Sequence, residues 1–115
     1  MIRRQISLDE EFPEIVTLCG STKFKEQFLE IQKKLSLEGK IVISVGLFGH
    51  ADNESKAWKN KETLDRVYLR KMDLADSIYV IDVEGYVGES TRREIEYAQS
   101  HNKKIKFYSQ EKIRK

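Results

Sequence analysis

The sequence predicts one α/β domain in which a mainly parallel sheet of four to five strands is covered by helices on both faces. Short apolar runs, typical of buried strands, alternate along the chain with segments whose apolar residues recur at helical spacing. Strands connected through helices pair in parallel with right-handed crossovers, so the helices cover both faces of the sheet. We therefore expect a three-layer, flavodoxin-like or Rossmann-like domain over residues 1–115 with strand order 2-1-3-4 and tails at 1–13 and 110–115.

Four segments have the composition of strands in such a sheet. Residues 14–20 (EIVTLCG) form an apolar run that ends at a glycine, and residues 40–48 (KIVISVGLF) are rich in β-branched and apolar residues. Residues 77–83 (SIYVIDV) and 103–109 (KKIKFYS) complete the set. Apolar runs of this length predict strands, since helices need longer periodic patterns.

Three segments show the periodicity of amphipathic helices. In the first, aromatic and aliphatic residues recur at helical spacing between positions 24 and 35, and Gly39 ends the helix. The second predicted helix covers about 62–75 and the third about 90–102. Residues 49–61 are polar and show no periodic pattern, which predicts a loop.

Composition and charge exclude several classes of function. Charged residues make up 35% of the chain and hydrophobic residues 39%, and 21 basic and 19 acidic side chains leave a net charge of +2, too balanced to predict nucleic-acid binding. The longest nearly apolar run, residues 41–49, is far shorter than a membrane span, and the start of the chain lacks the apolar region of a signal peptide. A single cysteine excludes an intramolecular disulfide and a multi-cysteine metal site. We expect a cytoplasmic protein that binds a small molecule and neither a membrane nor nucleic acid.

The strand order 2-1-3-4 places a ligand-binding crevice between the first and third strands, beyond their carboxyl ends. Two loops with glycine and hydroxyl residues flank this crevice, and the substrate-binding residues expected in them are Cys19, Gly20, Ser21, Thr22, Gly88, Glu89 and Ser90. Free N–H groups and the helix dipole favour an anion at such helix starts, although N-capping by Ser21 or Thr22 would explain the same residues. His50 is expected at the rim of the site, with an exposed loop position as the alternative.

Glu94 lies where the third helix should present an apolar residue to the sheet. If this helix begins near Ser90, then Thr91, Ile95 and Ala98 share the inward stripe with Glu94. Burying an unpaired carboxylate costs free energy, so we expect Glu94 to have a hydrogen-bonding partner, to face a water-filled cleft or to have a catalytic role. Thr91 and Glu94 also have the spacing of a capping box, in which the acid bonds back to the N–H of the cap residue. The sequence alone leaves both interpretations open.

Several stretches resemble the nucleoside 2-deoxyribosyltransferase superfamily, which includes the 2′-deoxynucleoside 5′-monophosphate N-glycosidases. They are VTLCGST in the first strand, DLADSIYVID leading into the third strand, and GESTRREIEYA followed by KKIKFY. The resemblance covers about residues 14–108 and is strongest with short bacterial and phage members of mostly unknown function.

The resemblance implies roles for particular residues. The stretch EIEYA places Glu94 at the position of the family's nucleophile, and residues 20–22 correspond to the loop that helps to hold the sugar or phosphate. The chain departs from the family's pattern at Glu96, Gly88 and Tyr68, where the family has a glycine, a serine and an acid that contacts the sugar.

The reaction implied is cleavage or transfer of the N-glycosidic bond of a (deoxy)nucleoside or a nucleoside 5′-monophosphate. A carboxylate beneath the anomeric carbon stabilises or traps an oxocarbenium-like state, and water or a second base then accepts the sugar. Asp73, expected as a second catalytic residue beside Glu94, would protonate the departing base, with Glu89 and His50 as alternatives for that role. Pairing with Arg70 or Lys71, or capping of the turn at the end of its helix, is the structural alternative for Asp73. The resemblance implies neither a metal nor a cofactor, and it implies a homodimer, which apolar residues on several sides of the helix at 62–75 also favour. The alternative is a non-catalytic nucleotide-binding or sensing module of the same fold.

Overall fold

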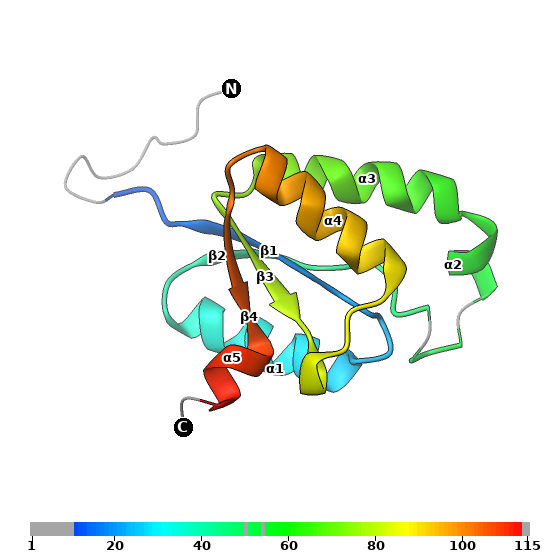
Figure 1. Ribbon diagram of the computed structural model, residues 1–115, viewed down its shortest axis with the longest axis horizontal. Helices are drawn as coiled ribbons and strands as arrows, with labels where there is room; N and C mark the ends of the chain where they lie inside the picture. Colours follow the sequence, from blue (N-terminus) through cyan, green and yellow to red (C-terminus); the bar gives the residue numbers. More distant parts are fainter. Residues whose placement is uncertain (1–10, 50, 54, 114–115) are drawn as a thin grey trace.

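The computed structural model describes residues 11–49, 51–53 and 55–113, which form a parallel sheet between two layers of helices (Figure 1). The four strands lie in the order β2-β1-β3-β4. Their bounds are β1 Ile15–Gly20, β2 Ile41–Ile43, β3 Ser77–Ile81 and β4 Lys104–Phe107. The predicted three-layer, flavodoxin-like architecture and its strand order are therefore confirmed.

Helices cover both faces of the sheet (Figure 1). On one face lie α1 Lys25–Leu37 and α5 Tyr108–Ile113, and on the other lie α3 Lys61–Leu74 and α4 Glu89–Ser100. Two short helices, α2 Ser55–Lys59 and the 3-10 turn η1 Val83–Gly85, lie in the connections. Among the described residues, no helix combines the length and the apolar composition that crossing a lipid bilayer requires.

The central strands β1 and β3 bury alternate side chains on opposite faces of the sheet, as the pleat of a strand requires. Leu18 packs with Phe28 of α1 on one side. Cys19 and Val80 pack with Met72 of α3 on the other. The two layers of the core hold α1, α3 and α4 at fixed positions around the carboxyl ends of the strands.

The backbones of β1 and β3 come very close at these carboxyl ends. Gly20 pairs with Ile81, has a φ of +144°, and a Cβ at this position would lie 2.7 Å from the Ile81 carbonyl oxygen. Glycine is therefore required where β1 ends. The connection after β1 leads toward β2, whereas the connection after β3 leads toward β4 on the opposite side of the sheet. A crevice therefore opens between the two loops that follow β1 and β3.

Two predicted segments on the β2 side differ from the structure. The strand expected at 40–48 is paired with β1 only from Ile41 to Ile43, and the apolar residues that follow, Val45 and Phe48, pack against the core from outside the sheet. The loop expected at 49–61 contains the five-residue helix α2, which is too short to show a periodic pattern.

The C-terminal segment also differs from the prediction. The strand expected at 103–109 ends at Phe107, and the chain continues as α5 where a tail was expected from residue 110. The Asp82 carboxylate accepts hydrogen bonds from the backbone N–H of Ser109 at 2.8 Å and from its hydroxyl at 2.7 Å. Contacts with residues far away in the sequence therefore fix the start of this helix, and a local pattern does not reveal them.

Candidate functional site

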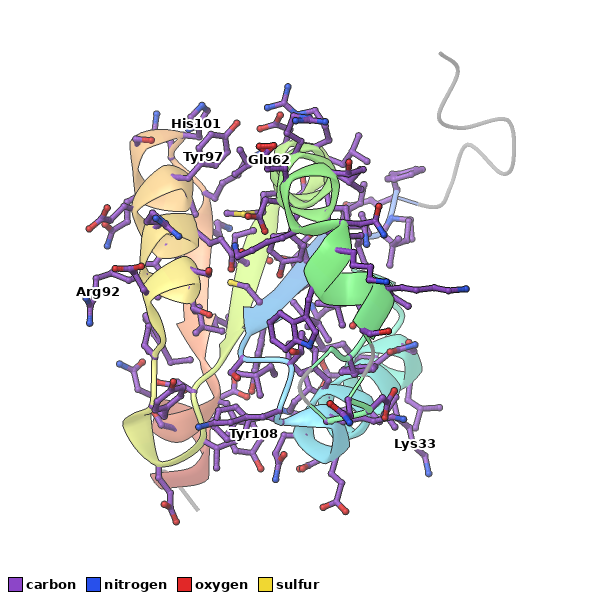
Figure 2. All side chains as sticks on the ribbon, turned by 90° about the vertical axis from the view of Figure 1, so that its right-hand side faces the viewer. Lys33, Glu62, Arg92, Tyr97, His101 and Tyr108 are labelled. Atoms are coloured by element: carbon purple, nitrogen blue, oxygen red, sulfur yellow. The ribbon has the colours of Figure 1, made fainter. Side chains whose placement is uncertain are left out.

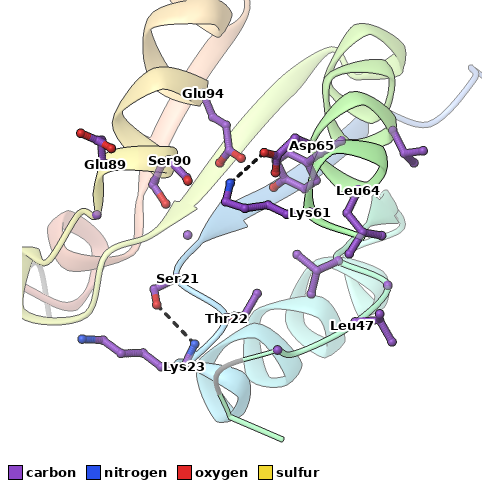
Figure 3. A pocket seen from close by; sticks show the side chains of 18 of the residues that line it. Ser21, Thr22, Lys23, Leu47, Lys61, Leu64, Asp65, Glu89, Ser90 and Glu94 are labelled. Atoms are coloured by element: carbon purple, nitrogen blue, oxygen red, sulfur yellow. Dashed lines mark hydrogen bonds and ion pairs between the residues drawn. The ribbon is translucent and has the colours of Figure 1, made fainter. Parts of the chain in front are cut away.

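A cavity of about 450 Å³ lies beyond the carboxyl ends of β1 and β3, and its volume falls within the range of small-molecule sites. Residues 20–23 of the β1–α1 loop and residues 88–91 at the start of α4 line one side of it. The segment after β2 and the inward side of α3 line the other. Figure 3 shows α4 and α3 facing each other across this space.

The first turn of α4 presents backbone N–H groups at the cavity. Gly88 is the N-cap residue in an extended conformation, and no side chain caps the helix among the described residues. The first bond within the helix runs from the N–H of Arg92 to the carbonyl of Gly88, and the N–H groups of the preceding residues have no partner inside the helix. Because Glu89, Ser90 and Thr91 line the cavity, this turn can receive an anion.

The capping-box interpretation of Glu94 is wrong. It requires Thr91 to be the N-cap, but the cap is Gly88 and Thr91 is a buried residue inside the first turn. Glu94 lies in the second turn, where its side chain cannot reach back to the N–H of the cap residue. The inward stripe is as predicted, since Thr91 and Ala98 are buried and Ile95 packs against the core.

The carboxyl of Glu94 faces α3 across the cavity, toward Lys61 and Asp65 (Figure 3). Lys61 Nζ pairs with Asp65 Oδ2 at 2.8 Å, and Glu94 makes no hydrogen bond with any residue that the structure describes. Burial of Glu94, followed by the charge of Asp65, raises its pKa from 4.5 to about 8, and Lys61 and Arg93 offset this only in part. Glu94 is therefore largely protonated at neutral pH.

Tyr68 of α3 lies at the boundary between the cavity and the core. Tyr68 lines the cavity, and its hydroxyl donates a hydrogen bond to the backbone carbonyl of Leu18. Cys19 is fully buried behind it, and burial raises the pKa of the Cys19 thiol well above its usual range. The expectation that Cys19 contacts the substrate must be corrected, because its side chain belongs to the core and does not line the cavity.

The β1–α1 loop places Gly20, Ser21 and Thr22 along the cavity, as expected. The alternative in which Ser21 or Thr22 caps α1 is wrong, because the N-cap is Phe24 and no side chain bonds to it in the described structure. The hydroxyl of Ser21 instead accepts a hydrogen bond from the N–H of Lys23 at 3.3 Å. The Lys23 ammonium lies 3.7 Å from the ring centroid of Tyr86 and thus links the two loops that flank the crevice.

Asp73 does not line the cavity, so the structure does not bring it together with Glu94. It accepts a hydrogen bond from the Tyr97 hydroxyl at 2.6 Å and pairs with Arg70 at 3.0 Å. Tyr97 stacks on His101 toward the C-terminal end of α4, and Figure 2 shows the two side chains there. Asp73 follows Asp65 by about two helical turns, and its side-chain contacts are with Arg70 of α3 and Tyr97 of α4. His50 lies outside the described residues.

Sequence reasoning missed the contribution of α3 to this site. Most cavity-lining residues of this helix recur every three or four positions, which is the spacing of one helical face. The lining residues are Lys61, Leu64, Asp65, Val67, Tyr68 and Lys71. The sequence did show this spacing of the α3 residues, but alternating charges on a helix usually indicate a side that faces solvent. Only the position of α3 beside Glu94 shows that its charged groups belong to a cavity.

Comparisons with known proteins add no relative. No family model matches the chain, and neither the characterised proteins nor the solved structures include a significant match. Arguments about function therefore depend on the residues of the site.

Proposed function

We propose that this protein cleaves or transfers the N-glycosidic bond of a (deoxy)nucleoside or nucleoside 5′-monophosphate, as a member of the nucleoside 2-deoxyribosyltransferase superfamily. The observation that carries the proposal is Glu94, an acid aimed into a cavity at the switch point of a parallel sheet, with an uncapped helix start on the same side. This combination offers a nucleophile and a place for a phosphate within one site.

The chemistry needs an ionised Glu94. One carboxylate oxygen forms a bond to C1′ of the sugar with its lone pair, while the C1′–N bond breaks and its electron pair leaves with the base. Water, or a second base, then attacks C1′ and returns the electron pair of the ester to Glu94. Partial burial makes the ionised carboxylate poorly solvated, and stabilising positive charge at the sugar relieves that penalty.

The start of α4 supports binding of the 5′-phosphate. The N–H groups of Glu89 and Ser90 lie in the first turn of a twelve-residue helix, and the Ser90 hydroxyl adds a donor. Glu94 follows one turn later on the same helix, about 6 Å along its axis from Ser90. A nucleotide anchored by its phosphate at this turn can therefore place its sugar over Glu94.

A non-catalytic nucleotide-binding module is the second candidate, and one observation favours it. Because the pKa of Glu94 is raised to about 8, its carboxyl is mostly neutral at pH 7 and can donate a hydrogen bond to a ligand. A binding role of this kind needs the shape and donor capacity of residue 94, whereas nucleophilic attack needs its negative charge.

Product analysis separates the two candidates. The protein is incubated with a panel of nucleosides and nucleoside 5′-monophosphates, with and without an acceptor base, and free base is measured. We expect base release by the wild type and none by Glu94→Gln, which keeps the shape and a donor but cannot attack C1′. Glu96→Gln, which changes an exposed glutamate of the same helix, is the matched control and should retain activity. If Glu94→Gln releases base at the wild-type rate, Glu94 is not a nucleophile; if the wild type binds nucleotides and releases no base, the binding module is supported.

A further inference from the structure

Lys61 and Asp65 form a charged pair on the wall of the cavity that faces Glu94. Both residues lie on α3 and line the cavity, and Figure 3 shows the carboxyl of Glu94 pointing toward them from α4. Lys61 Nζ lies 2.8 Å from Asp65 Oδ2, and the two side chains are 54% and 56% exposed. An ammonium group has three N–H donors, so the bond to Asp65 leaves two of them for a second acceptor.

The place of Lys61 is unfavourable for α3 itself. Lys61 is the first residue of this helix, directly after the N-cap Asn60, and the helix dipole repels a cation at this end. The order of the pair, with the lysine four residues before the acid, is also the weaker one on a helix. Because an exposed pair of this kind contributes little stability, Lys61 can turn away from Asp65 with little loss of free energy. The stability of α3 therefore gives no reason for a lysine at this position, whereas an acid across the cavity does.

Two buried neutral groups also lie near Glu94. Tyr68 of α3 and Cys19 of β1 are close enough to interact with it electrostatically, and burial raises the pKa of both well above the usual range. Neither group is charged at neutral pH, so neither of them balances the charge of an ionised Glu94.

The other lysines that line the cavity have partners elsewhere. The ammonium of Lys23 lies 3.7 Å from the ring centroid of Tyr86. Lys71 donates a hydrogen bond to the backbone carbonyl of Ser44 at 2.9 Å. Lys61 is thus the cavity lysine that the structure places opposite Glu94.

The charges around Glu94 act on it in opposite directions. Burial, followed by the charge of Asp65, raises its pKa to about 8. Lys61 opposes this rise, and does so more strongly than Arg93, an exposed neighbour of Glu94 on α4. The electrostatic effect therefore agrees with the arrangement of the three side chains in the cavity.

We propose that Lys61 is a positioning residue that serves as the counter-ion of ionised Glu94, and that Asp65 competes for the same ammonium group. This inference rests on the proposed function, in which Glu94 must be ionised. While Glu94 is neutral, Lys61 pairs with Asp65; when Glu94 ionises, the two carboxylates share the N–H donors of Lys61. Because two acids then face one lysine, the group keeps a net negative charge, which favours the positive charge that develops at C1′. Lys61 keeps its proton throughout.

The test measures the ionisation of Glu94 directly. Its side-chain carboxyl carbon is followed by carbon-13 NMR from pH 5 to pH 10, and the signal is identified by its absence from Glu94→Gln. Lys61→Met should raise the titration midpoint by about half a pH unit, because a positive charge that favours the ionised form is lost. Asp65→Asn should lower the midpoint by about as much, because a negative charge is removed and Lys61 is released. Lys61→Arg, which keeps the charge, should restore the wild-type midpoint.

Matched controls change the same charges at neighbouring exposed positions. They are Lys59→Met and Glu62→Gln, whose residues do not line the cavity, and they should leave the midpoint nearly unchanged. Base release gives a second readout: below the midpoint, kcat/KM should fall about threefold in Lys61→Met and rise about threefold in Asp65→Asn, and both variants should approach the wild-type rate above it.

The outcomes separate this inference from the proposed function. Midpoint shifts of opposite sign in Lys61→Met and Asp65→Asn support the inference even if no base is released and the proposed catalysis fails. A midpoint that stays in place in either variant, or that moves as far in Lys59→Met, overturns the inference and leaves the proposed function standing.

Discussion

Replacing Glu94 by glutamine should make the protein more resistant to unfolding at alkaline pH and leave its stability nearly unchanged at pH 5. In the folded protein the pKa of Glu94 is raised from 4.5 to about 8, mainly by burial. Between these two values the folded state holds a proton that the unfolded chain has released. Stability therefore falls as the pH rises through this window, and glutamine, which does not ionise, removes the loss.

The magnitude follows from the size of the shift. Inside the window, the wild type loses about 1.4 kcal/mol of unfolding free energy per pH unit from this group alone. The loss relative to the fully protonated state is about 1 kcal/mol at pH 5 and about 5 kcal/mol at pH 9. The difference of about 4 kcal/mol corresponds to roughly 15 °C in Tm for a domain of this size.

The assay is thermal unfolding of wild type, Glu94→Gln and Glu96→Gln in the same buffers from pH 5 to pH 9. All three proteins share the other titrating groups, so the Tm difference between a variant and the wild type at a given pH reports the effect of the changed residue alone. We call this difference the gap. The gap for Glu94→Gln should widen steadily with pH, whereas the exposed control on the same helix should keep a nearly constant gap. A gap for Glu94→Gln that is equal at pH 5 and pH 9 would refute a buried, protonated Glu94.

Three further outcomes are expected. Since only ionised Glu94 can attack C1′, kcat/KM for base release should rise about tenfold per pH unit below pH 8 and level off above it; a flat profile from pH 6 to pH 9 would contradict a nucleophilic role. Nucleoside 5′-monophosphates should bind more tightly than the free nucleosides, and this advantage should shrink as salt is added; equal affinities would argue against an anion site at the start of α4. A symmetric homodimer is expected because α3 exposes Val67 and Leu74, which are 45% and 63% accessible, and sedimentation as a monomer at micromolar concentration would count against it.

The sheet could be predicted because its signals are local. Strands β1, β2 and β3 are apolar runs, β4 alternates lysine with apolar residues, and each long helix has a periodic face. The handedness of parallel crossovers then fixes how these elements assemble. Elements that depend on distant partners could not be predicted in this way. The start of α5 depends on Asp82, which lies 27 residues earlier in the chain and binds Ser109 twice. Helix α2 offers five residues, fewer than two turns, which is too little for a pattern to show.

The site was predictable on one side only. Topology and glycine-rich loops placed residues 20–22 and 88–90 at the crevice, where the structure has them. The α3 side carries Lys61 and Asp65, a pair at the i, i+4 spacing that normally indicates a solvated helix face. Asp73 was expected to protonate the departing base, but α3 turns its carboxylate toward Arg70 and Tyr97. The elements that pack against a charged helix determine which of its sides faces a cavity.

Glu94 shows how small a difference in helix start separates two interpretations of one residue. Had α4 begun after Thr91, the carboxyl of Glu94 would have reached back to the cap residue's N–H and satisfied an orphan donor. The extended conformation of Gly88 starts the helix three residues earlier, so Glu94 falls in the second turn and its carboxyl has no backbone donor to bind. The sequence does not fix this helix start to within three residues, because Gly88, Ser90 and Thr91 are all residue types that occur at the N-cap. The same shift frees the first-turn N–H groups of α4 for an outside anion and leaves an acid beside them, and a nucleoside 5′-monophosphate would use both features in the proposed reaction.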